Sequence, residues 1–224
     1  MSLFRSSSSY ENRQASPVTA AVVFGIIIII ALYFGISGLI GGGKVSLDSA
    51  FESGMDKGSI VSGVPPYGAP QANLDYEHGV DSIPIGHEYY YMILSEDQQT
   101  ILLVRADKHF GENFDSESYK NINGTSIKGK VRMTSKDVTA KFSELTQLDE
   151  PEMKYIDTTY VSRSIKWFII AAINLLLIIV LIVNNAVFGR NGRPRGLVGA
   201  VTGLVSIAGM LAAGYLLIYN ILLN

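Results

Sequence analysis

Histidine is the residue type in this chain best suited to acid–base chemistry or metal binding, and it occurs three times, at His78, His87 and His109. Nucleophilic catalysis needs a serine or similar group held against a histidine and an acid, and no serine stands in a nucleophile-elbow pattern. The Asp75–His78 segment offers carboxylate and imidazole ligands, but its spacing matches no known zinc or calcium site. We therefore expect a solvated turn there, scattered surface histidines, and no catalytic, cofactor or metal site.

Two other signs of enzyme chemistry are missing from the sequence. The chain has no cysteine, which excludes a disulfide framework, a thiolate zinc site and a thiol nucleophile. Gly41–Lys44 is not a phosphate-binding loop, because it lacks a preceding glycine at Walker spacing and follows an apolar run. We expect a protein that is not an enzyme, with a membrane-bound hydrolase as the alternative.

Aromatic and polar motifs favour structural explanations. Tyr89–Tyr91 has the composition to stack on bases or sugars, but as a strand covered on both faces it is expected in the core. The segment from Lys44 to Arg163 holds 19 acidic and 12 basic residues, a net of about −7 that repels phosphate, so no nucleic-acid partner is expected. Asn123-Gly-Thr matches the N-glycosylation pattern, which matters only in a glycosylating source.

The residues discussed so far lie between long apolar segments. The chain contains three such runs, at residues 18–40, 167–188 and 197–223. At about 1.5 Å per residue, each run is long enough to cross a hydrocarbon core about 30 Å thick. The first run exceeds the apolar region of a cleaved signal peptide, so we expect an uncleaved anchor, with cleavage as the alternative. The chain is therefore predicted to lie in the plasma membrane as a multi-pass protein whose partner is the lipid bilayer.

Basic residues around the spans predict the orientation. Arg5 and Arg13 precede the first run, and the Arg190–Arg195 loop separates the second from the third. Short loops rich in Arg or Lys stay cytoplasmic, although Arg163 and Lys166 argue weakly the other way. The predicted segments are a cytoplasmic tail (1–17), a first span (18–40), an extracytoplasmic domain (44–163), a second span (167–188), a cytoplasmic Arg-rich loop (189–196) and a third span (197–223).

The segment between the first two spans predicts a small β-rich domain. Runs 89–94 and 100–104 are β-branched and aromatic and are separated by a polar connection of hairpin length. Ser46 is expected to cap a short helix and Ser135 an amphipathic one, whereas the proline-rich segment 63–72 is expected to be a loop. The fold class is an α+β membrane protein with three transmembrane helices and either a barrel of the oligonucleotide/oligosaccharide-binding type or an α+β sandwich.

The order of these motifs carries a resemblance. A membrane helix is followed by Ser59-Ile-Val-Ser-Gly63, Tyr90-Tyr-Met-Ile, Ile101-Leu-Leu-Val and Ser126–Arg132, and then by a second membrane helix. This order resembles that of a group of uncharacterised bacterial membrane proteins, mainly Gram-positive, with an extracytoplasmic β domain between membrane helices. The resemblance covers roughly residues 18–188 and implies no activity; the third span departs from the expected two-helix arrangement.

Small and polar residues inside the spans predict helix packing. Gly199, Gly203 and Ser206 recur at steps of three and four residues along the third span, a pattern that lets helix backbones approach closely. Asn174 is the strong polar group of the second span, and intramembrane polar groups usually face protein. Counting from the outer ends of the spans places Tyr33 and Tyr215 at a similar depth, so we expect either one to hydrogen-bond Asn174.

These features together favour a binding role. We expect an accessory, scaffold or sensing component that presents its β domain to an envelope partner or ligand. The partner is expected to be a membrane or envelope protein or a second copy of the chain.

Overall fold

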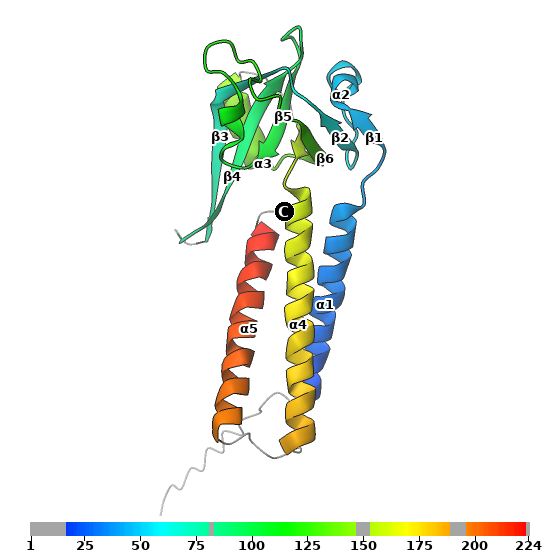
Figure 1. Cartoon of the computed structure of the whole chain (residues 1–224), viewed down its shortest axis with the longest axis vertical. Helices are drawn as coiled ribbons and strands as arrows, with labels where there is room; N and C mark the ends of the chain where they lie inside the picture. The colour runs from blue at the N-terminus through cyan, green and yellow to red at the C-terminus, as the bar shows by residue number, and fades with distance from the viewer. Residues whose placement is uncertain (1–16, 81–82, 147–152, 189–195, 223–224) are drawn as a thin grey trace, which may run out of the picture.

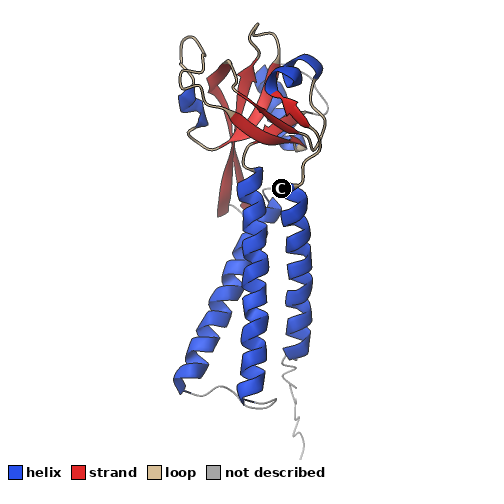
Figure 2. Cartoon of the chain, turned by 45° about the vertical axis from the view of Figure 1, so that its right-hand side comes forward, coloured by secondary structure: helices blue, strands red, loops and turns tan. Residues whose placement is uncertain are grey.

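An α+β domain lies at one end of three long helices (Figures 1 and 2). The computed structural model describes residues 17–80, 83–146, 153–188 and 196–222. The tail and the Arg-rich loop, on which the predicted orientation depends, therefore lie outside the described residues. The domain is inserted between the first and second long helices, as expected, and the last described turn of the third helix returns to the domain end.

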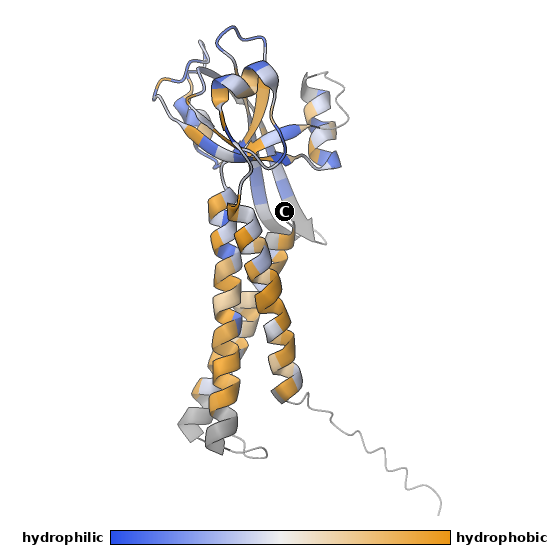
Figure 3. Ribbon diagram, turned by 90° about the vertical axis from the view of Figure 1, so that its right-hand side faces the viewer, coloured by the Kyte–Doolittle hydropathy of each residue, from blue (hydrophilic) through white to orange (hydrophobic). Residues whose placement is uncertain are grey.

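The three long helices are α1 (Pro17–Leu39), α4 (Tyr160–Phe188) and α5 (Gly196–Leu222). Each contains a segment long and apolar enough to cross a membrane, and Figure 3 shows this hydrophobic character along their length. The prediction of three helices long and apolar enough to cross a membrane is confirmed, but α4 begins seven residues before the predicted start at Trp167. The predicted span starts after Lys166 because that residue is charged. The helix extends further toward the domain because both Arg163 and Lys166 have partners in the structure.

The domain is built on one seven-stranded mixed sheet in the order β1-β2-β6-β7-β5-β4-β3. Pairs β1–β2 and β5–β7 are parallel, and the others are antiparallel. In the described residues β1 and β3 are the edges of this order, so a closed barrel is not shown. The strands are β1 (Lys44–Ser46), β2 (Ile60–Gly63), β3 (Tyr67–Val80), β4 (Ile83–Leu94), β5 (Ile101–Ala106), β6 (Ile127–Met133) and β7 (Lys154–Asp157).

Strand β3 corrects two predictions. Tyr67 onward was expected to be loop because of Pro70, and Asp75–His78 was expected to be a turn, yet both belong to this strand. Proline is tolerated on an edge strand or at a bulge, and β3 is both an edge strand and irregular between Ala69 and Leu74. The proline therefore marks the open edge of the sheet and does not end the strand.

The predicted tyrosine-rich hairpin forms the centre of the domain and separates two apolar cores. Tyr91 and Ile93 of β4 are buried in a first core with α2 (Leu47–Ser53) and the 3-10 helix η1 (Phe110–Asn113). Tyr90, on the opposite face, is buried in a second core under α3 (Lys136–Thr146). The prediction that the hairpin is covered on both faces is confirmed.

Both predicted helix caps of the domain are also confirmed. Ser46 accepts a hydrogen bond from the Ser49 amide at 3.1 Å, and Ser135 accepts one from the Val138 amide at 3.3 Å. A side-chain oxygen at these positions satisfies an amide that the helix itself cannot pair.

Candidate functional site

Charged side chains gather where α4 enters the β domain. Asp157 is the last residue of β7 and stands three residues before α4 begins, so the end of the sheet and the start of the helix share it. Its side chain is fully buried. The other members of this junction cluster come from three strands and α4: Glu88 on β4, Arg105 on β5, Arg132 on β6 and Arg163 on α4.

Asp157 connects three elements through its two carboxylate oxygens. Oδ2 lies 3.0 Å from Arg132 Nε and 3.6 Å from Arg163 Nη2. Oδ1 accepts hydrogen bonds from the Thr159 amide at 3.0 Å and from the Thr159 hydroxyl at 2.7 Å. A carboxylate just before a helix also interacts favourably with the helix dipole. Asp157 therefore fixes the first turn of α4 to β6 and β7.

Glu88 forms the second anionic centre of the cluster. Its Oε1 lies 2.6 Å from Arg105 Nη1 and 3.9 Å from Arg163 Nη2, and its Oε2 accepts a 2.5 Å hydrogen bond from the Tyr90 hydroxyl. Burial alone would lower the pKa of Arg105, but the neighbouring Glu88 and other anionic groups raise it above its ordinary value. Arg105 therefore stays charged, and Arg163 lies between the two carboxylates.

Lys130 of β6 joins the domain to α1. Its ammonium group donates to the backbone oxygens of Ser37 and Ile40 at 2.7 Å each, and to that of Gly38 at 3.4 Å. These carbonyls belong to the last turn of a helix, which lacks intrahelical donors and carries partial negative charge. Burial and the neighbouring Arg132 lower the pKa of Lys130. The domain thus holds the ends of both α1 and α4.

A half-open cavity of about 520 Å³ lies beside this junction, between α1, α4 and β6. Its charged lining consists of four bases, Lys57, Lys130, Arg132 and Arg163. No carboxylate lines it among the described residues, because Asp157 is enclosed behind the two arginines. Phe34 and Trp167 line the span side of the cavity, with their rings stacked at a centroid distance of 5.0 Å. We call this space the junction cavity.

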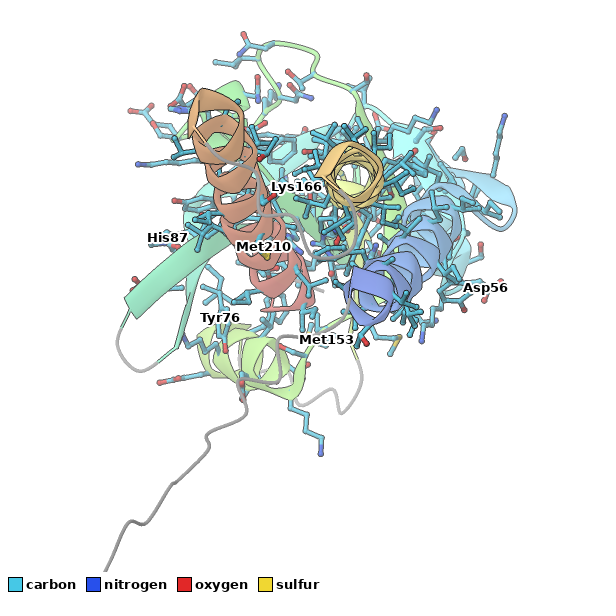
Figure 4. All side chains as sticks on the ribbon, turned by 90° about the horizontal axis from the view of Figure 1, so that it is seen from below. Asp56, Tyr76, His87, Met153, Lys166 and Met210 are labelled. Atoms are coloured by element: carbon cyan, nitrogen blue, oxygen red, sulfur yellow. The ribbon has the colours of Figure 1, made fainter. Side chains whose placement is uncertain are left out.

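A smaller cavity of about 260 Å³ lies on the α5 side of the same helix turn. Lys166 lines it and places its ammonium group 4.0 Å from the ring centre of Tyr219 on α5. Seen from below in Figure 4, Lys166 lies between α4 and α5, and His87 lies farther out beside α5. Arg163 lines both cavities, so α4 separates two polar spaces at the level where the helices meet the domain.

Asn174 is buried as predicted, but its hydrogen-bond partner differs from the predicted one. Its side chain is buried, and its amide nitrogen donates to the Ile170 carbonyl of its own helix at 2.8 Å. Tyr33 and Tyr215 are 67% and 61% exposed. The predicted tyrosine hydrogen bond is therefore wrong, because counting residues along the spans does not give the direction in which a side chain points around its helix.

Within the described part of the chain, the predicted glycine face of α5 is not where the helices meet, and its packing against a second copy stays a prediction. A Cβ added at Gly203 would contact nothing within 4 Å, and Ser206 is half-exposed. The surroundings of Gly199 lie outside the described side chains. The close approach occurs at Gly209, where an added Cβ would lie 3.0 Å from Leu177 of α4.

Sequence reasoning missed the tightest helix contact, which is between α1 and α4. Ala31 is fully buried, an added Cβ at Gly35 would lie 3.1 Å from the Phe168 ring, and one at Gly38 would overlap the Ser164 hydroxyl. Ala31, Gly35 and Gly38 follow steps of four and three residues, the signal that was applied to the third span. Searching the first span for the same spacing would have found this face.

The histidines of the described residues pair with acids. His87 Nδ1 lies 2.9 Å from Asp75 Oδ1, and His109 Nδ1 lies 2.6 Å from Glu112 Oε1. Both pairs are exposed, and neither imidazole has a serine partner in the part of the chain that the structure describes. The side chain of His78 lies outside that part. No group of three or more potential metal ligands is present within it.

The fold and the junction define a class: an α+β domain joined to α4 by buried ion pairs and to α1 by an ammonium group on helix carbonyls, with a third apolar helix beside them. Asn123, the possible glycosylation residue, is exposed and donates to Asn113 Oδ1 at 3.2 Å. Comparisons with protein-family models, curated proteins and solved structures gave no match.

Proposed function

We propose that this protein is a non-enzymatic plasma-membrane component that presents its β domain outside the cell to an envelope partner, as an accessory, scaffold or sensing module. The observation that supports this role is the buried ion-pair cluster that joins β4, β5, β6 and β7 to α4. Removing one member of a buried pair is strongly destabilising, so such a junction holds the domain at a fixed height and angle above the bilayer. Binding of a partner to the β domain then acts directly on the position of α4.

The external placement of the domain rests on charge. The Arg190–Arg195 loop and the basic tail favour the cytoplasmic side, and the domain segment is acidic. Since the chain has no cysteine, single cysteines at Asp97 and Asn191 give an unambiguous test with a membrane-impermeant maleimide on intact cells. We expect labelling at position 97 alone; labelling at position 191 alone would place the domain in the cytoplasm.

The presenting role is tested by photo-crosslinking in native membranes. A photoreactive residue replaces Glu77, which is exposed on edge strand β3, or Glu117 in a domain loop. The matched control replaces Ile29, which is 69% exposed on the apolar surface of α1. We expect a discrete protein adduct from a domain position and none from position 29. An adduct of twice the chain mass would identify a second copy as the partner. Adducts only from position 29 would contradict the proposal.

A membrane-bound hydrolase acting on an envelope substrate is the second candidate, and the His87–Asp75 pair is the observation that favours it. An exposed histidine held by a carboxylate is part of a catalytic triad, but a triad also needs a nucleophile in contact with the other ring nitrogen. A fluorophosphonate probe applied to the purified chain separates the candidates. Labelling that disappears in His87→Ala would favour the hydrolase, whereas we expect no labelling of the wild type.

A further inference from the structure

The geometry points to a ligand for the junction cavity: the phosphate-bearing headgroup of an anionic membrane lipid, with its acyl chain lying along the Phe34–Trp167 side. This inference goes beyond the presenting role, because it concerns the bilayer and not the partner that the domain binds. Three features of the cavity carry it: its charge, its level and its two-sided lining.

Among the described residues of the junction, cationic side chains outnumber carboxylates. Two carboxylates, Glu88 and Asp157, face the three arginines of the junction cluster and Lys130. Lys57 adds a further positive charge at the cavity mouth. Like charges gathered at a partly buried site repel one another; the pKa of Lys130 is lowered first by burial and then by the neighbouring Arg132. A bound anion would relieve this repulsion.

The donors suit a phosphate. Arg132 Nε lies 3.0 Å from Asp157 Oδ2 but makes no hydrogen bond within the described residues, and about a quarter of the side chain is exposed. A guanidinium carries five N–H donors in a planar fork that matches phosphate oxygens. Lys57 is exposed at the same cavity and is free of the ion pairs that hold the cluster together in the described residues. An arginine fork and a mobile ammonium from different elements would enclose a headgroup from two sides.

The position of the cavity favours a lipid over a soluble anion. It lies between the last turn of α1 and the first turns of α4, at the end of the apolar segments. Phe34 and Trp167 form its apolar side; Phe34 is 45% exposed, whereas Trp167, stacked on it, is 3% exposed. Tryptophan is enriched at headgroup level in membrane proteins. A lipid therefore matches both linings at once, whereas inorganic phosphate would use only the cationic one.

The single tryptophan of the chain gives a direct readout, because Trp167 lines the cavity. The full chain is purified in a neutral detergent and titrated with phosphatidylglycerol or phosphatidylcholine carrying brominated acyl chains, which quench tryptophan fluorescence. We expect saturable quenching by phosphatidylglycerol that weakens with salt. Equal quenching by the two lipids would overturn the proposal, since ordinary boundary lipid would explain it.

Charge variants test the same site. Lys57→Gln removes one cation outside the buried ion pairs, and we expect about fivefold weaker binding of phosphatidylglycerol, as for the loss of one basic residue near anionic lipid. Lys57→Glu should weaken binding further. The matched control Lys128→Gln lies on the same strand as Lys130 but lines a different cavity, and we expect no change. Unchanged affinity in both Lys57 variants would overturn the proposal.

Inorganic phosphate distinguishes the source of the anion. We expect phosphate to displace the brominated lipid only at far higher concentration, because it lacks the contact with Phe34 and Trp167. Displacement at a concentration comparable to that of the lipid would overturn the lipid assignment in favour of a soluble anion. These outcomes are independent of the crosslinking experiment, so a failed lipid site leaves the presenting role testable.

Discussion

Helix α4 contacts a neighbour on each side, and the two contacts differ in kind. Toward α1, an added side-chain carbon would crowd the Phe168 ring at Gly35 and overlap Ser164 at Gly38, and Lys130 holds the end of α1 to the domain. Toward α5, Gly203 and Gly214 face open space, and among the α5 glycines whose surroundings the structure describes Gly209 alone approaches α4 closely. Glycine content therefore does not identify a packing face in a membrane helix; the neighbour must actually cross the helix at that position.

The same asymmetry extends to the domain. α1 and α4 are held by ion pairs and by an ammonium on helix carbonyls, whereas the described end of α5 meets α4 through the Lys166–Tyr219 cation–π contact. Cation–π contacts contribute about 0.5–1 kcal/mol at exposed sites, less than a buried charge that has lost its partner costs. The domain, α1 and α4 should thus behave as one body, with α5 packed beside it.

The largest expected effect comes from breaking the ionic side. Asp157→Ala leaves Arg132 and Arg163 without their shared carboxylate and removes the hydrogen bonds to Thr159 just before α4, so we expect a loss of about 3–5 kcal/mol in the free energy of unfolding. Thermal unfolding in detergent measures it. Glu117→Ala, at an exposed acidic position, is the control and should change stability by less than about 0.5 kcal/mol. Equal losses of stability in Asp157→Ala and Glu117→Ala would show that the junction cluster does not stabilise the fold.

A matched pair of glycine substitutions tests the comparison itself. Gly38→Leu forces a side chain onto Ser164 and should cost about 1–3 kcal/mol by overpacking. Gly203→Leu places the same side chain in open space and should be nearly neutral. Thermal midpoints of both variants in the same detergent decide the matter, and a larger loss at Gly203 would restore the original prediction for α5.

An alkaline titration tests the burial of Tyr155 in the sheet. Burial and the nearby Asp157 raise the pKa of Tyr155, which is 4% exposed. The folded domain keeps this proton when the unfolded chain loses it near pH 10, so stability present below about pH 10 is lost as pH rises. We expect the wild type to lose about 1.4 kcal/mol more per pH unit than Tyr155→Phe above that point. Parallel pH profiles of the two proteins would contradict the assignment.

The smallest effect is expected at Asn174. Its hydrogen bond stays within its own helix, and intramembrane hydrogen bonds contribute about 0.6 kcal/mol on average. Asn174→Leu should therefore change the thermal midpoint very little and leave the α1–α4 contact intact. A loss of several kcal/mol would mean that the amide holds a partner outside α4.

Periodicity in the sequence predicts the spans, the hairpin and the two capped helices well, because each depends on local pattern and length. Pro70 misled the prediction because its compatibility with a strand depends on being at a sheet edge, which is a property of the whole topology. The junction cluster was missed for a similar reason: Glu88 and Arg105 are far in sequence from Asp157 and Arg163, and none of them belongs to a motif. Only the strand order brings them together.

The central claim, that the β domain is fixed on α1 and α4, is tested most directly by a distance measurement across the junction. Spin labels at Glu117 in the domain and Ile182 near the far end of α4 are introduced as cysteines into the cysteine-free chain, reconstituted in nanodiscs. Pulsed electron paramagnetic resonance should give one narrow distance distribution, and Asp157→Ala should broaden it. A broad distribution in the wild type, unchanged by Asp157→Ala, would contradict the account.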